Sequence, residues 1–150
     1  MKEKETILLV DDEPTVRSVL AEQLTGLGYR CIVAANAVDA MQIIEANLFT
    51  LDLMVTDIRM PGQLDGLDLA NKVRERQPEV AILLITGYAE SPRMRQAAQC
   101  GYRILEKPFR QSQLNAAIGE ELKRRKAPGA IGDDSPSVVS IVWARDRHRG

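Results

Sequence analysis

The sequence predicts an α/β protein in which a doubly wound, five-stranded parallel sheet carries helices on both faces. Two observations lead to this prediction. Five short apolar runs alternate with five segments whose apolar residues recur at helical spacing. The runs are continuous rather than alternating, which is typical of parallel strands buried on both faces. Strand and helix units in this order form one sheet covered by helices on both sides.

The predicted strands are runs rich in leucine, isoleucine and valine, residues that suit a buried pleated surface. They are Thr6–Val10, Tyr29–Ala34, Leu51–Asp57, Ala81–Thr86 and Tyr102–Glu106.

The first predicted helix begins at Pro14, because proline suits a first helical turn, and ends at Gly28. Its expected inward side chains are Val16, Val19, Leu20, Leu24 and Leu27. The second predicted helix is Ala37–Asn47, with Ala40, Met41, Ile44 and Leu48 at helical spacing.

Three more helices are expected, and each is followed by a breaker or places leucines on one side. They are Gly66–Gln77 before Pro78, with Leu67, Leu69, Ala70 and Val73 inward; Pro92–Gln99 before Gly101; and Gln111–Lys126, with Leu114, Ile118 and Leu122 on one face.

Composition narrows the function. The 150 residues are 45% hydrophobic and 27% charged, which suits one domain with a real core. A net charge of -1 gives no overall attraction to nucleic acid or an anionic membrane.

No apolar run is long enough to span a bilayer, and the N-terminus lacks the order of charged and apolar residues that a signal peptide has. Cys31 and Cys100 are isolated, so we expect a reduced, cytoplasmic protein. The single histidine, His148, lies near the C-terminus, which excludes most histidine-based chemistry from the folded body.

We expect one domain over residues 1–126 and a flexible linker and tail over residues 127–150. Residues 127–136 are rich in Pro, Gly, Asp and Ser, residues 137–144 are apolar, and residues 145–150 are basic. The apolar stretch is compatible with an incidental patch in a flexible tail, or with a strand or docking segment. The basic end has no interleaved aromatic residues, so it is weak support for nucleic-acid binding.

Polar residues lie at, or just after, the carboxyl ends of four of the predicted strands. They are Asp11 and Asp12, Asp57, Thr86 and Lys107. Ligands of parallel α/β sheets bind outside the carboxyl ends of the strands, where neighbouring loops converge. We therefore expect these side chains to share one cleft.

Three carboxylates in one cleft would repel each other, by about 4 kcal/mol for a pair about 4 Å apart at an effective dielectric near 20. A hard divalent cation relieves this repulsion, and Mg²⁺ prefers carboxylates, carbonyl oxygens such as that of Arg59, water and phosphoryl oxygens. Lys107 would add a positive charge and Thr86 a hydroxyl donor. This set suits phosphoryl transfer, with Asp57 as the acceptor.

Each residue also has a simpler interpretation. An acid pair before a helix is commonly an N-cap, and taken alone Asp11 and Asp12 favour that role. Asp57 could form a turn, Thr86 could bind local backbone, and Lys107 before proline could lie in a surface turn. Their coincidence at one sheet edge favours the shared site.

The predicted strand ends carry four motifs: Leu-Leu-Val-Asp-Asp-Glu-Pro, Val-Thr-Asp-Ile-Arg-Met-Pro-Gly with Leu64-Asp65-Gly66, Leu-Leu-Ile-Thr-Gly-Tyr-Ala, and Leu-Glu-Lys-Pro-Phe. In these motifs the sequence resembles the receiver domain of bacterial two-component response regulators, over about residues 6–126. The resemblance implies a flavodoxin-like (βα)5 fold with strand order 2-1-3-4-5. It also implies that Asp57 accepts a phosphoryl group from a phosphohistidine of a sensor histidine kinase or histidine phosphotransfer protein. Mg²⁺ would be held by Asp11, Asp12, Asp57 and the Arg59 carbonyl, while Thr86 and Lys107 would grip the phosphoryl oxygens.

Three positions depart from the family pattern. Members usually carry an aromatic residue three positions before the lysine, where this chain has Ile104, and Tyr102 lies two residues further back. The stretch from Gly101 to Lys107 is one residue short, and residues 62–66 form a loop one residue longer than usual. These changes bear on the usual coupling of the threonine to a rotating aromatic ring and on the shape of the cleft.

A phosphoryl group adds about -1.5 to -2 charge and three acceptor oxygens. We expect it to draw in Thr86 and Lys107 and so shift the surface of the fourth helix, fifth strand and last helix. Arg59 and Tyr88 flank the acceptor, so we expect them to tune the lifetime of the phosphoryl group.

No effector domain follows in this sequence, so we expect a stand-alone regulator rather than an enzyme. Its output would be contact with an unknown downstream protein or phosphorelay, and a homodimer through the last helix or fourth-helix face is possible. Membrane and nucleic acid are not expected partners. A magnesium phosphohydrolase would use similar chemistry, but its first-strand Asp-x-Asp is absent. A phosphate-blind scaffold would lack a site residue, and none is missing.

Overall fold

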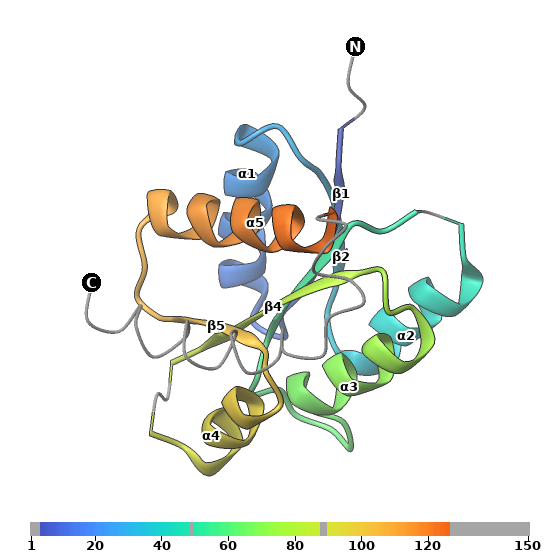
Figure 1. The fold of residues 1–150 in the computed structure, drawn as a ribbon, viewed down its shortest axis with the longest axis vertical. Coiled ribbons are helices and arrows are strands. Elements are labelled where there is room, and N and C mark those ends of the chain that lie inside the picture. The colour runs from blue at the N-terminus through green and yellow to red at the C-terminus, as the bar shows by residue number, and fades with distance from the viewer. Residues whose placement is uncertain (1–3, 49, 88–89, 127–150) are drawn as a thin grey trace.

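Five parallel strands form one sheet in the order β2-β1-β3-β4-β5 (Figure 1). The computed structural model describes residues 4–48, 50–87 and 90–126. The strands are β1 (Thr6–Val10), β2 (Arg30–Ala34), β3 (Leu53–Asp57), β4 (Ala81–Thr86) and β5 (Arg103–Glu106). The helices are α1 (Pro14–Gly26), α2 (Ala37–Ala46), α3 (Gly66–Arg76), α4 (Pro92–Gln99) and α5 (Gln111–Lys126). This confirms the predicted fold and strand order. The predicted linker and tail, residues 127–150, lie outside the described residues.

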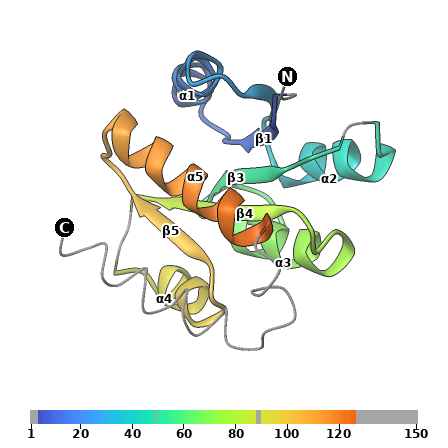
Figure 2. The ribbon, with the colours of Figure 1, turned by 45° about the horizontal axis from the view of Figure 1, so that its top comes forward.

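The sheet separates two hydrophobic cores. Alternate strand residues such as Leu8, Met54 and Leu84 pack with α2, α3 and α4, while their neighbours Leu9 and Val55 pack with α1 and α5. Figure 2 shows these two layers of helices on opposite sides of the sheet. Because successive strand residues point to opposite faces, continuous apolar runs are what a sheet covered on both sides requires.

Two strands begin one residue later than predicted, for the same reason. The backbone N–H of Tyr29 donates to the Leu24 carbonyl, and that of Tyr102 donates to the Ala97 carbonyl. Each tyrosine thus satisfies an open carbonyl at the end of the preceding helix. Just before them, Gly28 (φ 102°) and Gly101 (φ 90°) adopt the left-handed backbone that such helix endings use.

β3 begins at Leu53 rather than Leu51. The carboxylate of Asp52 accepts a hydrogen bond from the Thr6 amide at 2.8 Å and from the Arg125 guanidinium at 3.1 Å. Asp52 therefore ties together the amino ends of β1 and β3 and the end of α5. That is the edge of the sheet opposite to Asp57.

The helix predictions were wrong in detail at two apolar positions. Val19 is 48% exposed, because the buried stripe of α1 consists of Leu20 and Leu24, and Val19 lies a full 100° around the helix from Leu20. Leu48 is 77% exposed, because Asn47 adopts a left-handed cap at φ 55° and ends the helical period. α1 and α3 also end before Gly28 and Gln77, at Gly26 and Arg76.

β5 is joined to α5 by a buried cation. The Arg103 side chain is almost fully buried, and its guanidinium lies 2.6 Å from a Glu120 oxygen and 3.5 Å from a Glu121 oxygen. Burial lowers the pKa of Arg103 and raises that of Glu121, while the opposite charges act against both shifts. The strand and the helix are therefore held together by charge as well as by apolar packing.

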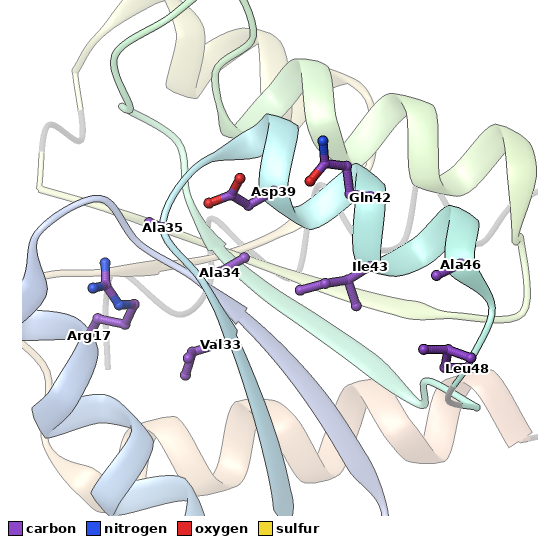
Figure 3. A pocket seen from close by; sticks show the side chains of 9 residues that line it. All are labelled: Arg17, Val33, Ala34, Ala35, Asp39, Gln42, Ile43, Ala46 and Leu48. Carbon is purple, nitrogen blue, oxygen red and sulfur yellow. The ribbon is translucent and has the colours of Figure 1, made fainter.

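A pocket of about 520 Å³ opens at the outer edge of the sheet (Figure 3). It lies between Arg17 of α1, the end of β2 and the outer side of α2. Its lining residues are Arg17, Val33, Ala34, Ala35, Asp39, Gln42, Ile43, Ala46 and Leu48. None of the predicted site residues lines it. Among the described residues, no helix combines the length and apolarity needed to cross a bilayer.

The first residue of α3 is pressed against the backbone of Asp57. The Gly66 N–H donates to the Ile58 carbonyl at 2.8 Å, and a Cβ on Gly66 would lie 1.9 Å from the Asp57 carbonyl oxygen. Any side chain at position 66 would therefore push α3 away from the end of β3.

Gly66→Ala is expected to lower the free energy of unfolding by about 1–3 kcal/mol, the usual cost of overpacking. The matched control is Gly119→Ala in α5, where an added Cβ meets nothing within 4 Å. The control should raise stability by about 0.5–1 kcal/mol, because alanine favours helix over glycine. Urea unfolding of both variants checks this, and equal effects would contradict the close contact.

Candidate functional site

Lys107 and Asp57 meet at the carboxyl edge of the sheet. The Lys107 ammonium donates to Asp57 Oδ2 at 2.6 Å, across 50 residues of sequence. The other oxygen, Asp57 Oδ1, accepts the backbone N–H of Arg59 at 3.1 Å. The Asp57 residue is 9% exposed, so its carboxylate is held at the mouth of the site rather than sealed inside. The convergence expected for these two side chains is observed, while their roles remain predictions.

Asp11 lies at the end of the neighbouring strand and is 2% exposed. Burial is the main cause that raises its pKa, and the charges of Asp57 and Asp12 raise it further. The N–H of Glu13 and the charge of Lys107 oppose this rise. The charges of Asp12, Asp57 and Lys107 therefore all act on Asp11, which places the four side chains near one another.

The N-cap of α1 is Glu13, not Asp11 or Asp12. The Glu13 carboxylate accepts the N–H groups of Thr15 at 2.7 Å and Val16 at 3.2 Å. Asp11 instead accepts the Glu13 N–H at 2.9 Å. The capping interpretation of the acid pair is therefore wrong, and Asp12 projects as an exposed residue at the same edge.

Thr86 is the last residue of β4 and is buried. Its carbonyl accepts the backbone N–H of Lys107 at 2.7 Å, and its neighbour Ile85 pairs with Asp57 in the sheet. The threonine therefore lies one strand away from the acceptor and beside the lysine. Tyr88, the other residue expected near the acceptor, lies outside the described residues.

The donor set suits a hard cation in its chemistry. Asp11, Asp12 and Asp57 are carboxylates at one sheet edge, and the charges of the other two add to the burial that raises the pKa of Asp11. Carboxylates are ligands that a hard divalent cation prefers. Within the described ranges, however, no three Asp, Glu, His or Cys side chains are grouped closely enough to hold a metal. One oxygen of Asp57 is occupied by the Lys107 ammonium at 2.6 Å.

The position of the usual aromatic residue holds Ile104, which is fully buried in the core. Tyr102, also buried, donates its hydroxyl to Asn71 Oδ1 at 2.7 Å, and the Arg74 guanidinium lies 4.1 Å from the ring centroid. These contacts fix the ring against α3. The usual aromatic position therefore holds an aliphatic side chain, and the Tyr102 ring is engaged with α3.

The longer loop before α3 ends in a well-formed cap. Asp65 is the N-cap and forms a capping box with Asp68, while Gly62 adopts φ 109°. Arg93 of α4 binds both aspartates. Sequence reasoning missed Arg93, since its partners are 25 and 28 residues away and no local pattern marks them.

The fold and the site together define a doubly wound α/β protein with acids, a threonine and a lysine at the carboxyl edge of its sheet. The family model of the response regulator receiver domain matches residues 7–119. The chain belongs to this family.

Individual relatives agree with this assignment. The chain is 34% identical over 121 residues to the sensor kinase CckA of Brucella abortus, an alignment that covers 80% of this chain and 13% of that protein. The receiver protein from Sinorhizobium medicae is 31% identical with a TM-score of 0.75, covering 83% of this chain and 98% of that one. The regulator TrrA from Thermotoga maritima, solved in complex with Mg²⁺-BeF, is 31% identical with a TM-score of 0.66, covering 77% and 97%. The chain spans less than a third of the first three curated relatives.

Tyr102→Phe is expected to lower the free energy of unfolding by about 1 kcal/mol, through loss of the hydrogen bond to Asn71. Burial is the main cause that raises the pKa of Tyr102 to about 12. The contribution of Tyr102 to stability is therefore fully present at a pH below the ordinary pKa of tyrosine, and it is lost as the pH rises through about 12. Ultraviolet titration should show the late phenolate in the wild type and not in the variant. A variant that keeps it would contradict the assignment.

Proposed function

We propose that this chain accepts a phosphoryl group on Asp57 from the phosphohistidine of a sensor histidine kinase or histidine phosphotransfer protein. The observation that carries the proposal is the contact of Asp57 Oδ2 with the Lys107 ammonium at 2.6 Å. The cation lies against one oxygen of the carboxylate that would act as the nucleophile. It also lies where negative charge gathers when a phosphoryl group arrives.

In the proposed step a carboxylate oxygen of Asp57 forms a bond to phosphorus as the phosphorus–nitrogen bond of the donor breaks. The imidazole leaves with the electron pair of that bond. Lys107 can then pass from the carboxylate to a phosphoryl oxygen, and the Thr86 hydroxyl can donate to another. Positioned charge of this kind is the main contribution that a protein makes to phosphoryl transfer.

Mg²⁺ would be held by Asp11, Asp12, Asp57 and the carbonyl of Arg59. When bound, it neutralises the acids and the incoming phosphoryl oxygens. The donor chemistry at the sheet edge supports this, as does the Mg²⁺-BeF complex of the Thermotoga relative. The backbone N–H of Arg59 donates to Asp57 Oδ1 and so holds the loop that carries the Arg59 carbonyl beside Asp57.

The chain would act as a response regulator in the cytoplasm, not as an enzyme that turns over a substrate. Its output would be conformational change and contact with a downstream protein, with phosphorelay and a homodimer as related possibilities. Relatives named as a sensor kinase and as transcriptional regulators support a role in such pathways. Arg59 is exposed beside the acceptor, which supports the proposal that it tunes the lifetime of the phosphoryl group.

Incubation with acetyl phosphate and Mg²⁺ is expected to add one phosphoryl group to the chain, measured by intact mass. Asp57→Asn and chelation of Mg²⁺ should both abolish the addition. The matched control is Asp52→Asn, just before the opposite end of β3, which should still accept the group. Phosphorylation that survives Asp57→Asn would disprove the assignment, and steady turnover of small phosphate esters would favour a phosphohydrolase instead.

Lys107→Gln is expected to slow phosphorylation by about 10²–10³-fold, the usual cost of losing one charge-stabilising donor. Lys123→Gln, an exposed lysine of α5, is the control and should leave the rate unchanged. Rates are measured by intact mass at matched acetyl phosphate concentrations. Equal rates for the two variants would show that Lys107 plays no part in transfer.

A further inference from the structure

Arg93 joins the first turn of α4 to the first turn of α3. Its Nε and Nη2 atoms donate to the two oxygens of Asp65, each at 2.8 Å, and Nη2 also donates to Asp68 Oδ1 at 3.0 Å. Nη1 donates to Gln96 Oε1 at 2.9 Å, which fixes the guanidinium on its own helix. Arg93, Asp65 and Asp68 are called the Arg93 clamp below.

The clamp has the geometry of a strong contact. A guanidinium that meets both oxygens of one carboxylate forms two parallel charge-assisted hydrogen bonds with a fixed orientation. Partial burial works against ionisation of Asp65, but the hydrogen bonds from Arg93 and from the Asp68 amide outweigh it and lower the pKa of Asp65. The contact is therefore directional and charged near neutral pH.

The two aspartates also fix where α3 begins. Asp65 Oδ1 accepts the Asp68 N–H at 2.9 Å, and Asp68 Oδ2 accepts the Asp65 N–H at 3.1 Å. The next residue, Gly66, is in contact with the Asp57 carbonyl and bonds to Ile58. The clamp thus binds the part of α3 that abuts the acceptor.

α4 depends on such polar contacts for its position. It is eight residues long, and Ala97 is its only fully buried residue, with Met94 and Ala98 packed partly against the core. A helix with so little buried apolar surface is weakly held by packing alone. The contact of the Arg93 guanidinium with Asp65 and Asp68 therefore contributes much to the orientation of the first turn of α4.

We propose that Arg93 is a positioning residue that couples the acceptor to α4. It holds the start of α3 against the backbone of Asp57 and carries changes at this acceptor into α4. The inference rests on the proposed function for its meaning in signalling. It supplies a route that the fixed ring of Tyr102 and the buried side chain of Ile104 do not.

The first test needs no phosphorylation. Arg93→Gln is expected to raise deuterium exchange several-fold in two separate segments, residues 58–66 and residues 91–99. Arg93→Lys keeps the positive charge but cannot contact both oxygens of Asp65, so its exchange should lie between that of the wild type and that of Arg93→Gln. The matched control is Arg95→Gln, whose guanidinium donates to the Glu90 carbonyl just before α4. A change confined to residues 91–99 in Arg93→Gln would overturn the coupling.

The second test adds acetyl phosphate and Mg²⁺ to the full chain. Phosphorylation should change exchange in residues 91–99 of the wild type and of Arg95→Gln. The change should be less than half as large in Arg93→Gln at the same phosphorylated fraction by intact mass. A full response in Arg93→Gln, or no response in a phosphorylated wild type, would overturn the proposal. A wild type that takes up no phosphoryl group would disprove the proposed function, and the first test would still decide the clamp.

Discussion

The ion pair between Asp57 and Lys107 is the interaction on which the rest of the site depends. Three carboxylates at one sheet edge repel each other, and burial makes the charged form of Asp11 more costly still. The ammonium of Lys107 offsets this repulsion without closing the site, because it contacts one oxygen of Asp57 and comes from a different strand. The parallel sheet makes this possible, since β3 and β5 end at the same edge although 50 residues separate the two side chains.

A second constraint is steric. Gly66 lets the start of α3 lie directly on the carbonyl of Asp57, so a shift of either one would press on the other. The Arg93 clamp then extends this contact to α4, which has little apolar packing of its own. The close contact at Asp57 and the weak packing of α4 together suit the transmission of a local change from Asp57 to α4. The change is carried by a few polar contacts rather than by repacking of the core.

The sequence predicted the fold and the meeting of Asp57 with Lys107 because both follow from strand ends of one parallel sheet. Taken alone, Asp11 and Asp12 favoured the cap of α1, because aspartate is a common N-cap, but the geometry gives that role to Glu13. Two strands were predicted to start one residue early, at Tyr29 and Tyr102, because the amides of these residues bond to the preceding helices, a contact that the hydrophobic pattern does not report. Arg93 was missed for a different reason: its partners are distant in sequence, and arginines on exposed helix faces are common.

The buried Arg103 has a consequence for exchanging segments between relatives. Its guanidinium lies within β5 and relies on Glu120 and Glu121, which belong to α5. A chimera that imports a last helix without both glutamates would strand a cation in the interior, and removing the partner of a buried charge is strongly destabilising. β5 and α5 must therefore be exchanged together. A chimera with its junction in the loop between them would separate Arg103 from its glutamates and would fold poorly.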